Sequence, residues 1–348
     1  MESLDERVKL SEGEKFSRRN FLSSSGVVIA AGLAPLISFA NTEAEGLKEQ
    51  QKSNPMPRNN DTSIDSVLEP RMDAFIKDLK RSRHLNPTDE ISITVYDIDH
   101  SRKFAGINED VRRMAASTIK DYVMLAVFHE VKSGNLKYTA KVKGLVESMI
   151  SYNRGLADGN HSANVLIDML GGTQGVNQIL RGNYKFFNET RTVEHIPTNA
   201  RTYRNTTSTH DLSIFYNQLW VGNLPYANEM KRILSLPKHD RIFDGTCIPS
   251  GTRVLNKTGT VYGLVADSGI LVMKDDKGKT HPYIINVIIE DKTKPHSKDR
   301  NGSAGWIKYR SDIIRELSEG AYDFLYQLHT GKPYYCNKHQ GRHLGGHQ

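Results

Sequence analysis

The sequence contains little cysteine, with only Cys247 and Cys336 among its 348 residues. Two thiols are too few for a fold held together by several disulfides, so the stability of the core must come from apolar packing. The two cysteines are expected either to be free thiols or to form one bridge that ties the C-terminal tail to the rest of the protein.

Long apolar runs are also missing. The weakly apolar stretch at residues 26–37 holds twelve residues, which is too few to span a bilayer. It follows a twin-arginine pattern, S-R-R-N-F-L, at residues 17–22, and small residues precede Ala40 as at a cleavage site. Residues 1–40 are therefore predicted to be a twin-arginine signal peptide, with an uncleaved anchor as the alternative. The protein is expected to be exported by the twin-arginine machinery and to work in the periplasm or outside the cell.

Motifs for nucleic acid binding are absent, although the chain carries a formal net charge of +7. The first 40 residues hold equal numbers of basic and acidic side chains, so the positive surplus belongs to the rest of the chain. A basic surface favours anionic cell-wall polymers or membranes, or is simply a solvated face. No nucleic acid partner is expected, and the protein is expected to be a monomer.

Composition divides the chain into a signal peptide, a polar linker at residues 41–64, a body at residues 65–330 and a tail at residues 331–348. The body is long enough for one large domain or two closely packed subdomains. The tail is expected to be disordered. Its three histidines recur every four residues with no carboxylate or thiolate among them, which is poor evidence for a metal site. We expect neither a metal nor a cofactor.

The body has strand patterns near both ends and helical patterns between them. This order predicts a mixed α+β fold, in which the terminal helices cover one face of an antiparallel sheet and a helical subdomain covers the other. The patterns cover residues 72–79 for the first helix, 91–95 and 103–107 for a hairpin, 117–236 for the helical section, 253–262, 263–273 and 282–289 for three strands, and 307–329 for the last helix.

Ser117 and Lys120 stand three residues apart at the start of an apolar helix. Positions i and i+3 share a helix face, so the lysine amine can reach the serine hydroxyl. A lysine at the buried root of a helix, close to a second cation, is pushed toward its neutral form and can accept the serine proton. The pair is therefore a candidate activated nucleophile. The alternative is a buried helix start that carries a serine by chance.

A second candidate motif is the run Lys257, Thr258, Gly259 and Thr260, which lies in a stretch with strand character. A glycine inside a strand marks the close approach of a ligand or of another backbone. Lys257 is also a candidate for the second cation near Lys120. The alternative is an edge-strand glycine without a function.

An S-x-x-K motif followed by a K-T-G motif after a helical section is typical of serine β-lactamases and penicillin-binding proteins. Over residues 65–330 the chain resembles this superfamily, specifically its class A β-lactamase branch. The resemblance implies a β-lactamase/transpeptidase-like fold with the active site between the two subdomains. It is carried by residues 114–120, 161–172, 192–197, 205–209 and 257–260.

The second motif of that family has two candidate positions here. A Ser-x-Asn tripeptide is expected directly before the helix at residues 161–172, but D-G-N stands there at 158–160, and S-Y-N lies seven residues earlier at 151–153. Adjacency favours the first tripeptide. The chemistry favours the second, because a serine hydroxyl would pass a proton to the leaving nitrogen, whereas an aspartate would face an anionic substrate. We therefore expect Ser151 to be catalytic and Asn153 to bind substrate.

Residues 192–197 resemble the Ω-loop segment that carries the deacylating glutamate of the family, which would be Glu194 here. The family has four residues from this glutamate to an asparagine, whereas Asn199 follows Glu194 by five. The resemblance therefore implies a general base for deacylation in a segment whose spacing has changed.

The resemblance implies acyl transfer in two steps. Ser117 attacks the amide of a β-lactam or a cell-wall peptide, with Lys120 or a water held by Glu194 as the base, and Ser151 passes the proton to the departing nitrogen. The backbone N–H groups of Ser117 and Thr260 form the oxyanion hole.

The run that ends in Thr260 would bind the substrate. Lys257 and Thr258 would hold the substrate carboxylate, and Gly259 would let the strand approach it. The expected activity is β-lactam hydrolysis of the class A kind. The alternatives are a D-alanyl-D-alanine peptidase and a β-lactam sensor that is acylated but not freed.

Overall fold

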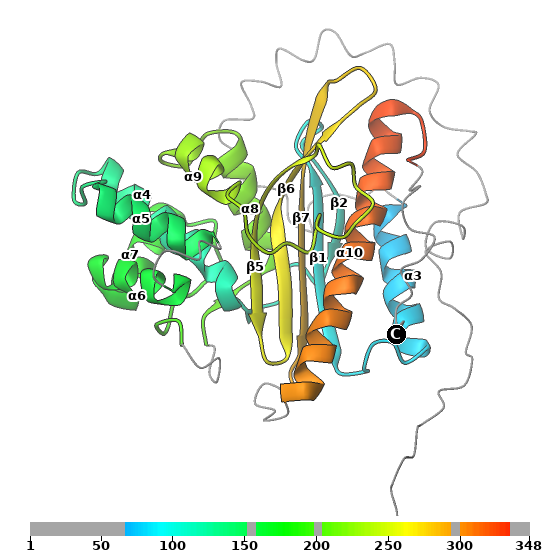
Figure 1. Ribbon diagram of the computed structural model, residues 1–348, viewed down its shortest axis with the longest axis horizontal. Coiled ribbons are helices and arrows are strands. Elements are labelled where there is room, and N and C mark those ends of the chain that lie inside the picture. The colour runs from blue at the N-terminus through cyan, green and yellow to red at the C-terminus, as the bar shows by residue number, and fades with distance from the viewer. Residues whose placement is uncertain (1–66, 152–157, 198–203, 294–299, 335–348) are drawn as a thin grey trace, which may run out of the picture.

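A five-stranded antiparallel sheet forms the centre of the protein, in a computed structural model that describes residues 67–151, 158–197, 204–293 and 300–334 (Figure 1). The strand order is β2-β1-β7-β6-β5, so the first and last parts of the sheet in sequence meet where β1 pairs with β7. The strands are β1 (Asp89–Asp97), β2 (Arg102–Ile107), β5 (Arg253–Val261), β6 (Leu264–Lys274) and β7 (Thr280–Asp291).

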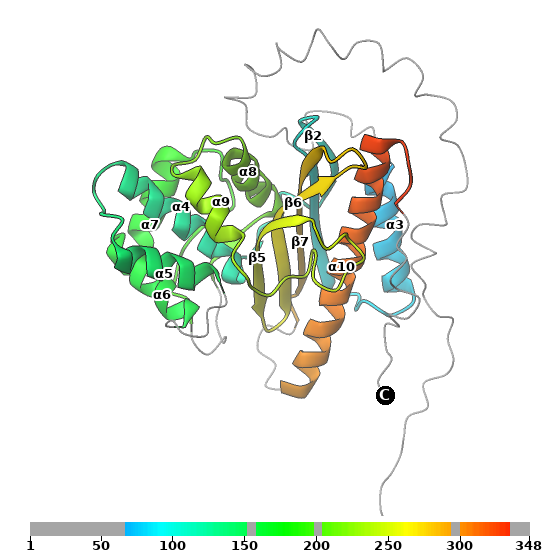
Figure 2. The same ribbon diagram turned by 45° about the horizontal axis from the view of Figure 1, so that its top comes forward.

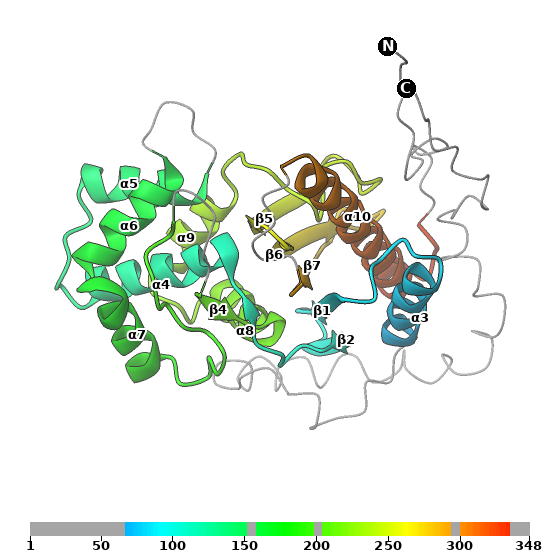
Figure 3. The same cartoon turned by 90° about the horizontal axis from the view of Figure 1, so that it is seen from below.

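Two helices from opposite ends of the chain, α3 (Leu68–Arg81) and α10 (Arg300–Thr330), cover one face of this sheet (Figure 3). Leu79 of α3 and Leu317 of α10 are buried in the same apolar core as Val95 of β1. None of the helices within the described ranges is long and apolar enough to cross a membrane.

The helices between the two parts of the sheet cover its other face and extend into a lobe beside β5 (Figure 2). Tyr122 and Phe215 of this lobe share a second apolar core with Ile288 of the sheet. The elements are β3 (Arg113–Met114), the 3₁₀ turn η1 (Ala116–Thr118), α4 (Ile119–Lys132), α5 (Ala140–Ile150), α6 (Gly159–Met169), α7 (Gly172–Asn183), β4 (Thr206–Thr207), α8 (Thr209–Trp220) and α9 (Ala227–Leu234).

This arrangement confirms the predicted α+β fold, with terminal helices on one face of an antiparallel sheet and a helical subdomain on the other. The predicted hairpin is present, with Ile93 of β1 opposite Ile107 of β2. The last helix begins at Arg300, seven residues before its predicted start.

The structure tests the expectation that the cysteines are free thiols. Cys247 is disulfide-bonded, so the expectation of a free thiol is wrong for this residue. The remaining cysteine of the sequence, Cys336, lies outside the described residues. The Tyr334 hydroxyl donates to the Cys247 carbonyl at 2.8 Å, and the Cys247 backbone N–H donates to Glu319 of α10 at 2.8 Å. The loop before β5 is therefore fastened to the last helix.

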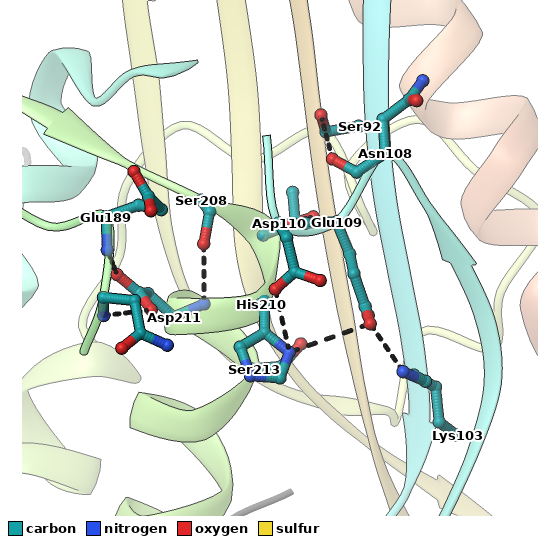
Figure 4. Close-up of polar contacts among 12 residues, drawn as sticks. Ser92, Lys103, Asn108, Glu109, Asp110, Glu189, Ser208, His210, Asp211 and Ser213 are labelled. Atoms are coloured by element: carbon teal, nitrogen blue, oxygen red, sulfur yellow. Dashed lines mark hydrogen bonds and ion pairs between the residues drawn. The ribbon is translucent and has the colours of Figure 1, made fainter. Parts of the chain in front are cut away.

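Asp211 in the first turn of α8 fixes the segment that precedes residue 194. Its carboxylate accepts hydrogen bonds from the backbone N–H groups of Asn188, Glu189 and Thr190 at 3.0, 2.8 and 2.8 Å (Figure 4). Its own backbone N–H donates to the Ser208 hydroxyl, which caps the helix. A buried carboxylate that accepts several backbone donors holds the loop in one place.

The start of α8 is also tied to the central sheet by buried charges. The Lys103 ammonium of β2 lies 2.5 Å from a Glu109 carboxylate oxygen, and the His210 backbone N–H donates to the Glu109 carbonyl at 3.0 Å (Figure 4). The three side chains are at most 4% exposed. Because a buried charge needs a close partner of opposite sign, this ion pair fixes β2 relative to α8.

Candidate active site

Ser117 lies on η1, the single 3₁₀ turn that opens α4. The residue before it, Ala116, is buried and has a φ of +45°, a left-handed conformation that strains a residue with a side chain. The backbone therefore makes a sharp, strained turn immediately before the candidate nucleophile. The surrounding packing must hold this turn in place, and strain of this kind is common at active sites.

Strand β5 approaches this turn at Gly259. A β-carbon at this glycine would lie 3.2 Å from the Ala116 β-carbon and 3.3 Å from the Ala115 carbonyl oxygen, which is tighter than ordinary van der Waals contact. A side chain here would push the strand away from η1. The glycine thus lets the run at residues 257–260 lie against the turn that carries Ser117.

Lys120 is 5% exposed and donates from Nζ to the Asn160 side-chain oxygen at 2.8 Å. Burial, and next the positive charge of Lys257, lower the pKa of Lys120 to about 7. Near neutral pH the Lys120 amine is therefore uncharged in a substantial fraction of the molecules. Lys120 lies about one helical turn after Ser117. The uncharged form is the protonation state that a general base for a serine hydroxyl requires.

Lys257 is the cation that acts on Lys120. It is buried, and its Nζ donates to the Thr258 carbonyl at 3.0 Å. Burial lowers the pKa of Lys257, but the negative charges of Asp121 and Asp267 oppose that shift. Burial raises the pKa of Asp121 to about 7, and this carboxyl group accepts a hydrogen bond from the Tyr216 hydroxyl at 2.9 Å. The two buried aspartates, Asp121 and Asp267, thus favour the charged form of Lys257.

The tripeptide at residues 158–160 packs directly on Lys120. A β-carbon at Gly159 would lie 2.8 Å from the Ser148 carbonyl oxygen and 3.7 Å from the Lys120 Nζ, so only glycine fits without a shift of the backbone. Asp158 caps α6 by accepting the backbone N–H of Asn160 at 3.1 Å. This cap places Asn160 in the first turn of α6, where its amide meets Lys120.

The predicted role of Ser151 as the proton relay stays a prediction, and the structure shows where the residue lies. It is the C-cap of α5, and its hydroxyl donates to the Glu147 carbonyl at 2.7 Å. The Glu147 carbonyl also accepts the Ser151 backbone N–H at 2.8 Å, so both bonds hold Ser151 at the end of α5. The structure therefore brings Asn160, and not Ser151, to Lys120. The predicted substrate ligand Asn153 lies outside the described residues.

Glu194, the predicted deacylating base, is bound by Arg204. One carboxylate oxygen accepts the Arg204 backbone N–H at 2.6 Å and the other accepts the Arg204 Nε at 3.0 Å. The Asn205 side chain holds the Glu194 backbone, accepting from its N–H at 3.1 Å and donating to its carbonyl at 3.0 Å. Both carboxylate oxygens of Glu194 thus already accept hydrogen bonds within their own loop. Asn199, which sets the altered spacing, falls in a gap of the described chain.

Two residues of this segment bond to α6: His195, whose Nε2 lies 2.7 Å from an Asp168 carboxylate oxygen, and Ile196. The Asn164 side chain accepts the Ile196 backbone N–H at 2.7 Å and donates to the Ile196 carbonyl at 3.0 Å. Asn160 and Asn164 are four residues apart and lie on one face of α6. Ile196, with a buried apolar side chain, therefore stands beside the face that carries Asn160, and Glu194 lies two residues upstream.

Arg241 is a site residue that no sequence motif indicated. Its guanidinium group donates to the Thr260 hydroxyl at 2.7 Å, and its backbone N–H donates to Asp267 at 2.5 Å. The loop that carries it lies sixteen residues before Lys257, and only the folded chain brings it to the end of β5. With Lys257 it places a second cation beside the substrate-binding run.

Comparison with known proteins agrees with this geometry. A family model described as the beta-lactamase enzyme family matches residues 73–325. No curated protein matches the sequence.

Three similar solved structures show the fold that the chain shares with them. An acyl-enzyme complex of a PBP-A variant with penicillin G is 19% identical, covers 80% of this chain and 99% of its own, and has a TM-score of 0.57. A β-lactamase from Sphaerobacter thermophilus is 18% identical, covers 72% of this chain and 95% of its own, and has a TM-score of 0.55. The TLA-1 extended-spectrum β-lactamase is 16% identical, covers 74% of this chain and 98% of its own, and has a TM-score of 0.58.

The environment of Lys120 predicts the pH dependence of serine acylation. Because the base must be uncharged, the second-order rate constant for acylation by a fluorescent penicillin should rise with pH through about 7 and then level off. Replacing Lys257 with Gln removes the cation that helps to lower the pKa of Lys120, so the rise should move to higher pH. A wild-type profile that is flat around pH 7, or a rise that stays in place in the variant, would contradict this role of Lys120.

The position of Asn160 predicts which of the two tripeptides supports acylation. Asn160→Ala should lower the acylation rate constant by about 10²-fold, because a small misplacement of a catalytic group costs about this much. Ser151→Ala is the matched control and should change the rate constant by less than about threefold, since its hydroxyl bonds to its own helix. Both variants should be checked by thermal unfolding. The opposite order of effects would restore Ser151 as the proton relay.

Proposed function

The chain belongs to the beta-lactamase enzyme family. On that premise we propose that Ser117 is acylated by β-lactams, whose ring opens in this step, and that the acyl group is then released slowly. The observation that carries this proposal is the buried Lys120 amine, held by Asn160 and lowered in pKa by burial and by Lys257. This arrangement supplies an uncharged base one helical turn from the serine.

The proposed acylation step moves one proton twice. Lys120 takes the proton of the Ser117 hydroxyl as the oxygen attacks the lactam carbonyl carbon, and the backbone N–H groups of Ser117 and Thr260 stabilise the oxyanion. When the carbon–nitrogen bond breaks, the ammonium formed at Lys120 returns the proton to the nitrogen. The products are an ester at Ser117 and an opened ring with a neutral amine.

The proposed binding of substrate uses the cations beside β5. A β-lactam antibiotic of the penicillin type carries a carboxylate, and Lys257, Thr258 and Arg241 offer an ammonium, a hydroxyl and a guanidinium group at one end of the strand. Charge-assisted hydrogen bonds of this kind are stronger than neutral ones. The penicillin G adduct of the similar PBP-A variant supports a ligand of this class.

Slow release follows from the Glu194 contacts. A base for deacylation must bind the attacking water, but Arg204 donates to both oxygens of this carboxylate and so competes with that water, and the apolar Ile196 bonds to the helix that carries Asn160. These contacts favour the expected alternatives, a β-lactam sensor or a D-alanyl-D-alanine peptidase with slow β-lactam turnover, over an efficient β-lactamase.

We also propose that the protein acts in an oxidising compartment outside the cytoplasm. The twin-arginine pattern at residues 17–22 supports export of a folded chain. The disulfide at Cys247 supports the same compartment, because such bonds persist in oxidising environments. The partners proposed are the export machinery and a small β-lactam or cell-wall peptide.

A time course of intact mass tests both steps of the proposal. Brief incubation with penicillin G should add one ligand to the wild-type protein and none to Ser117→Ala. After free ligand is removed, the wild-type adduct should persist, and Glu194→Gln should change its lifetime by less than about threefold. Ile196→Glu should shorten the lifetime by about tenfold or more, because it places a carboxylate next to the Asn160 face.

The control for the last variant is Ile196→Gln, which has nearly the same shape without a charge, and both must retain cooperative thermal unfolding. Rapid loss of the wild-type adduct together with a trapped Glu194→Gln adduct would show that Glu194 is the base and that the protein is a β-lactamase. A wild-type protein that stays unmodified by penicillins and cephalosporins would overturn the proposal as a whole.

A further inference from the structure

We propose that a group of histidines and aspartates at one end of the sheet binds a divalent transition-metal ion, of which Zn²⁺ is the reference, and so fastens the end of α10 to the sheet. The group brings together the end of β1, the turn after it, the turn between β6 and β7, the start of β7 and the last turn of α10. Its members, named here the histidine–aspartate cluster, are Asp97, Asp99, His100, Asp275, His281 and His329.

Asp97 is the centre of the first set of candidate ligands. One of its carboxylate oxygens lies 2.6 Å from His100 Nδ1 and 2.9 Å from His329 Nε2. The Asp97 side chain is fully buried, His329 is 5% exposed, and His100 lies half in solvent, where it offers a path for an ion. Two imidazole nitrogens and a carboxylate oxygen that converge in this way form a donor set suited to zinc.

A second set of candidate ligands shares His329. The ligand atoms of Asp99, His281 and His329 all lie within 4.8 Å of one another. The His281 ring lies between two carboxylates, with Nδ1 2.8 Å from Asp99 and Nε2 3.3 Å from Asp275, and its centroid is 4.0 Å from that of His329. The second set therefore orients the ring of His329 next to the first set.

Charge and donor type together indicate the ion. The cluster carries three carboxylates, part of them buried, so a divalent cation is favoured there. Imidazole nitrogen with carboxylate oxygen suits zinc, copper and nickel, whereas Mg²⁺ and Ca²⁺ prefer oxygen alone. Zinc bonds of about 2.0–2.1 Å place tetrahedral ligand atoms about 3.3 Å apart, so the first set must open by about half an ångström.

The cluster and the active site lie on opposite faces of the sheet. Side chains alternate along a strand, so Asp97 points to the same face as Val95, which belongs to the core shared with α10. By the same alternation Lys257 shares the face of Leu255, which belongs to the core of the helical lobe. Metal binding should therefore stabilise the attachment of α10 and leave acylation of Ser117 unchanged.

The test is Zn²⁺ binding by the full chain after treatment with a chelator. The tail carries His339, His343 and His347, so all measurements use a background in which these three are replaced by Gln. In this background, calorimetric titration with Zn²⁺ should give one site per chain. A saturating amount should raise the melting temperature by about 5 °C or more, and the same amount of Mg²⁺ should not. Substitution with Co²⁺ should give the visible absorption of a protein-bound ion.

Variants of the cluster decide whether it is the site. His329→Gln, added to this background, should abolish the stoichiometric Zn²⁺ site, and the exposed His100→Gln should weaken it at least tenfold with little change in the melting temperature of the metal-free protein. His84→Gln, at a histidine outside the cluster, is the matched control and should bind as the background does. Absence of the site in the background protein would overturn the proposal. So would Zn²⁺ binding that His329→Gln and His100→Gln leave unchanged, or variants that lose the same stability with and without Zn²⁺.

Discussion

The proposed chemistry depends on one buried lysine amine, whose pKa burial and a neighbouring cation lower to about 7. An ammonium group removed from water is costly unless a negative partner is close, and Lys120 instead meets the amide oxygen of Asn160 and the positive charge of Lys257. The helical lobe and the sheet each supply one of these two neighbours. Burial between the helical lobe and the sheet, together with the charge of Lys257, is therefore what lowers the pKa of the amine, and a loose interface would let water stabilise its protonated form.

Much of the fold could be predicted from the sequence because its strands and helices have clear apolar periodicity. The amphipathic helix α3 buries one face as its pattern predicts, and the hairpin of β1 and β2 forms at the predicted place, although both faces of β1 are buried. The close approach at Gly259 was also predictable, because a glycine inside a strand has few other uses. The strand order could not be predicted, since it depends on contacts between distant segments.

The surroundings of the second motif and of the loop base could not be predicted, because they depend on contacts that the local sequence does not contain. Ser151 has the right chemistry for a relay, but α5 ends at Ile150, and the end of that helix uses the serine hydroxyl for its own carbonyl. Glu194 has the right charge, but Arg204 lies close to it only after the chain folds back. In both cases a nearby backbone or side-chain group already shares a hydrogen bond with the predicted catalytic group. Arg241 shows the opposite case, because only the tertiary fold brings it to Thr260.

The central claim, that Lys120 is uncharged near neutral pH, is tested most directly by titrating the side-chain signals of the protein labelled at its lysines, using NMR. The signal that disappears in Lys120→Arg identifies the residue. This signal should titrate with a pKa of about 7, and the titration should move to higher pH in Lys257→Gln. A Lys120 that keeps its proton up to about pH 10, like an exposed lysine, would contradict the account.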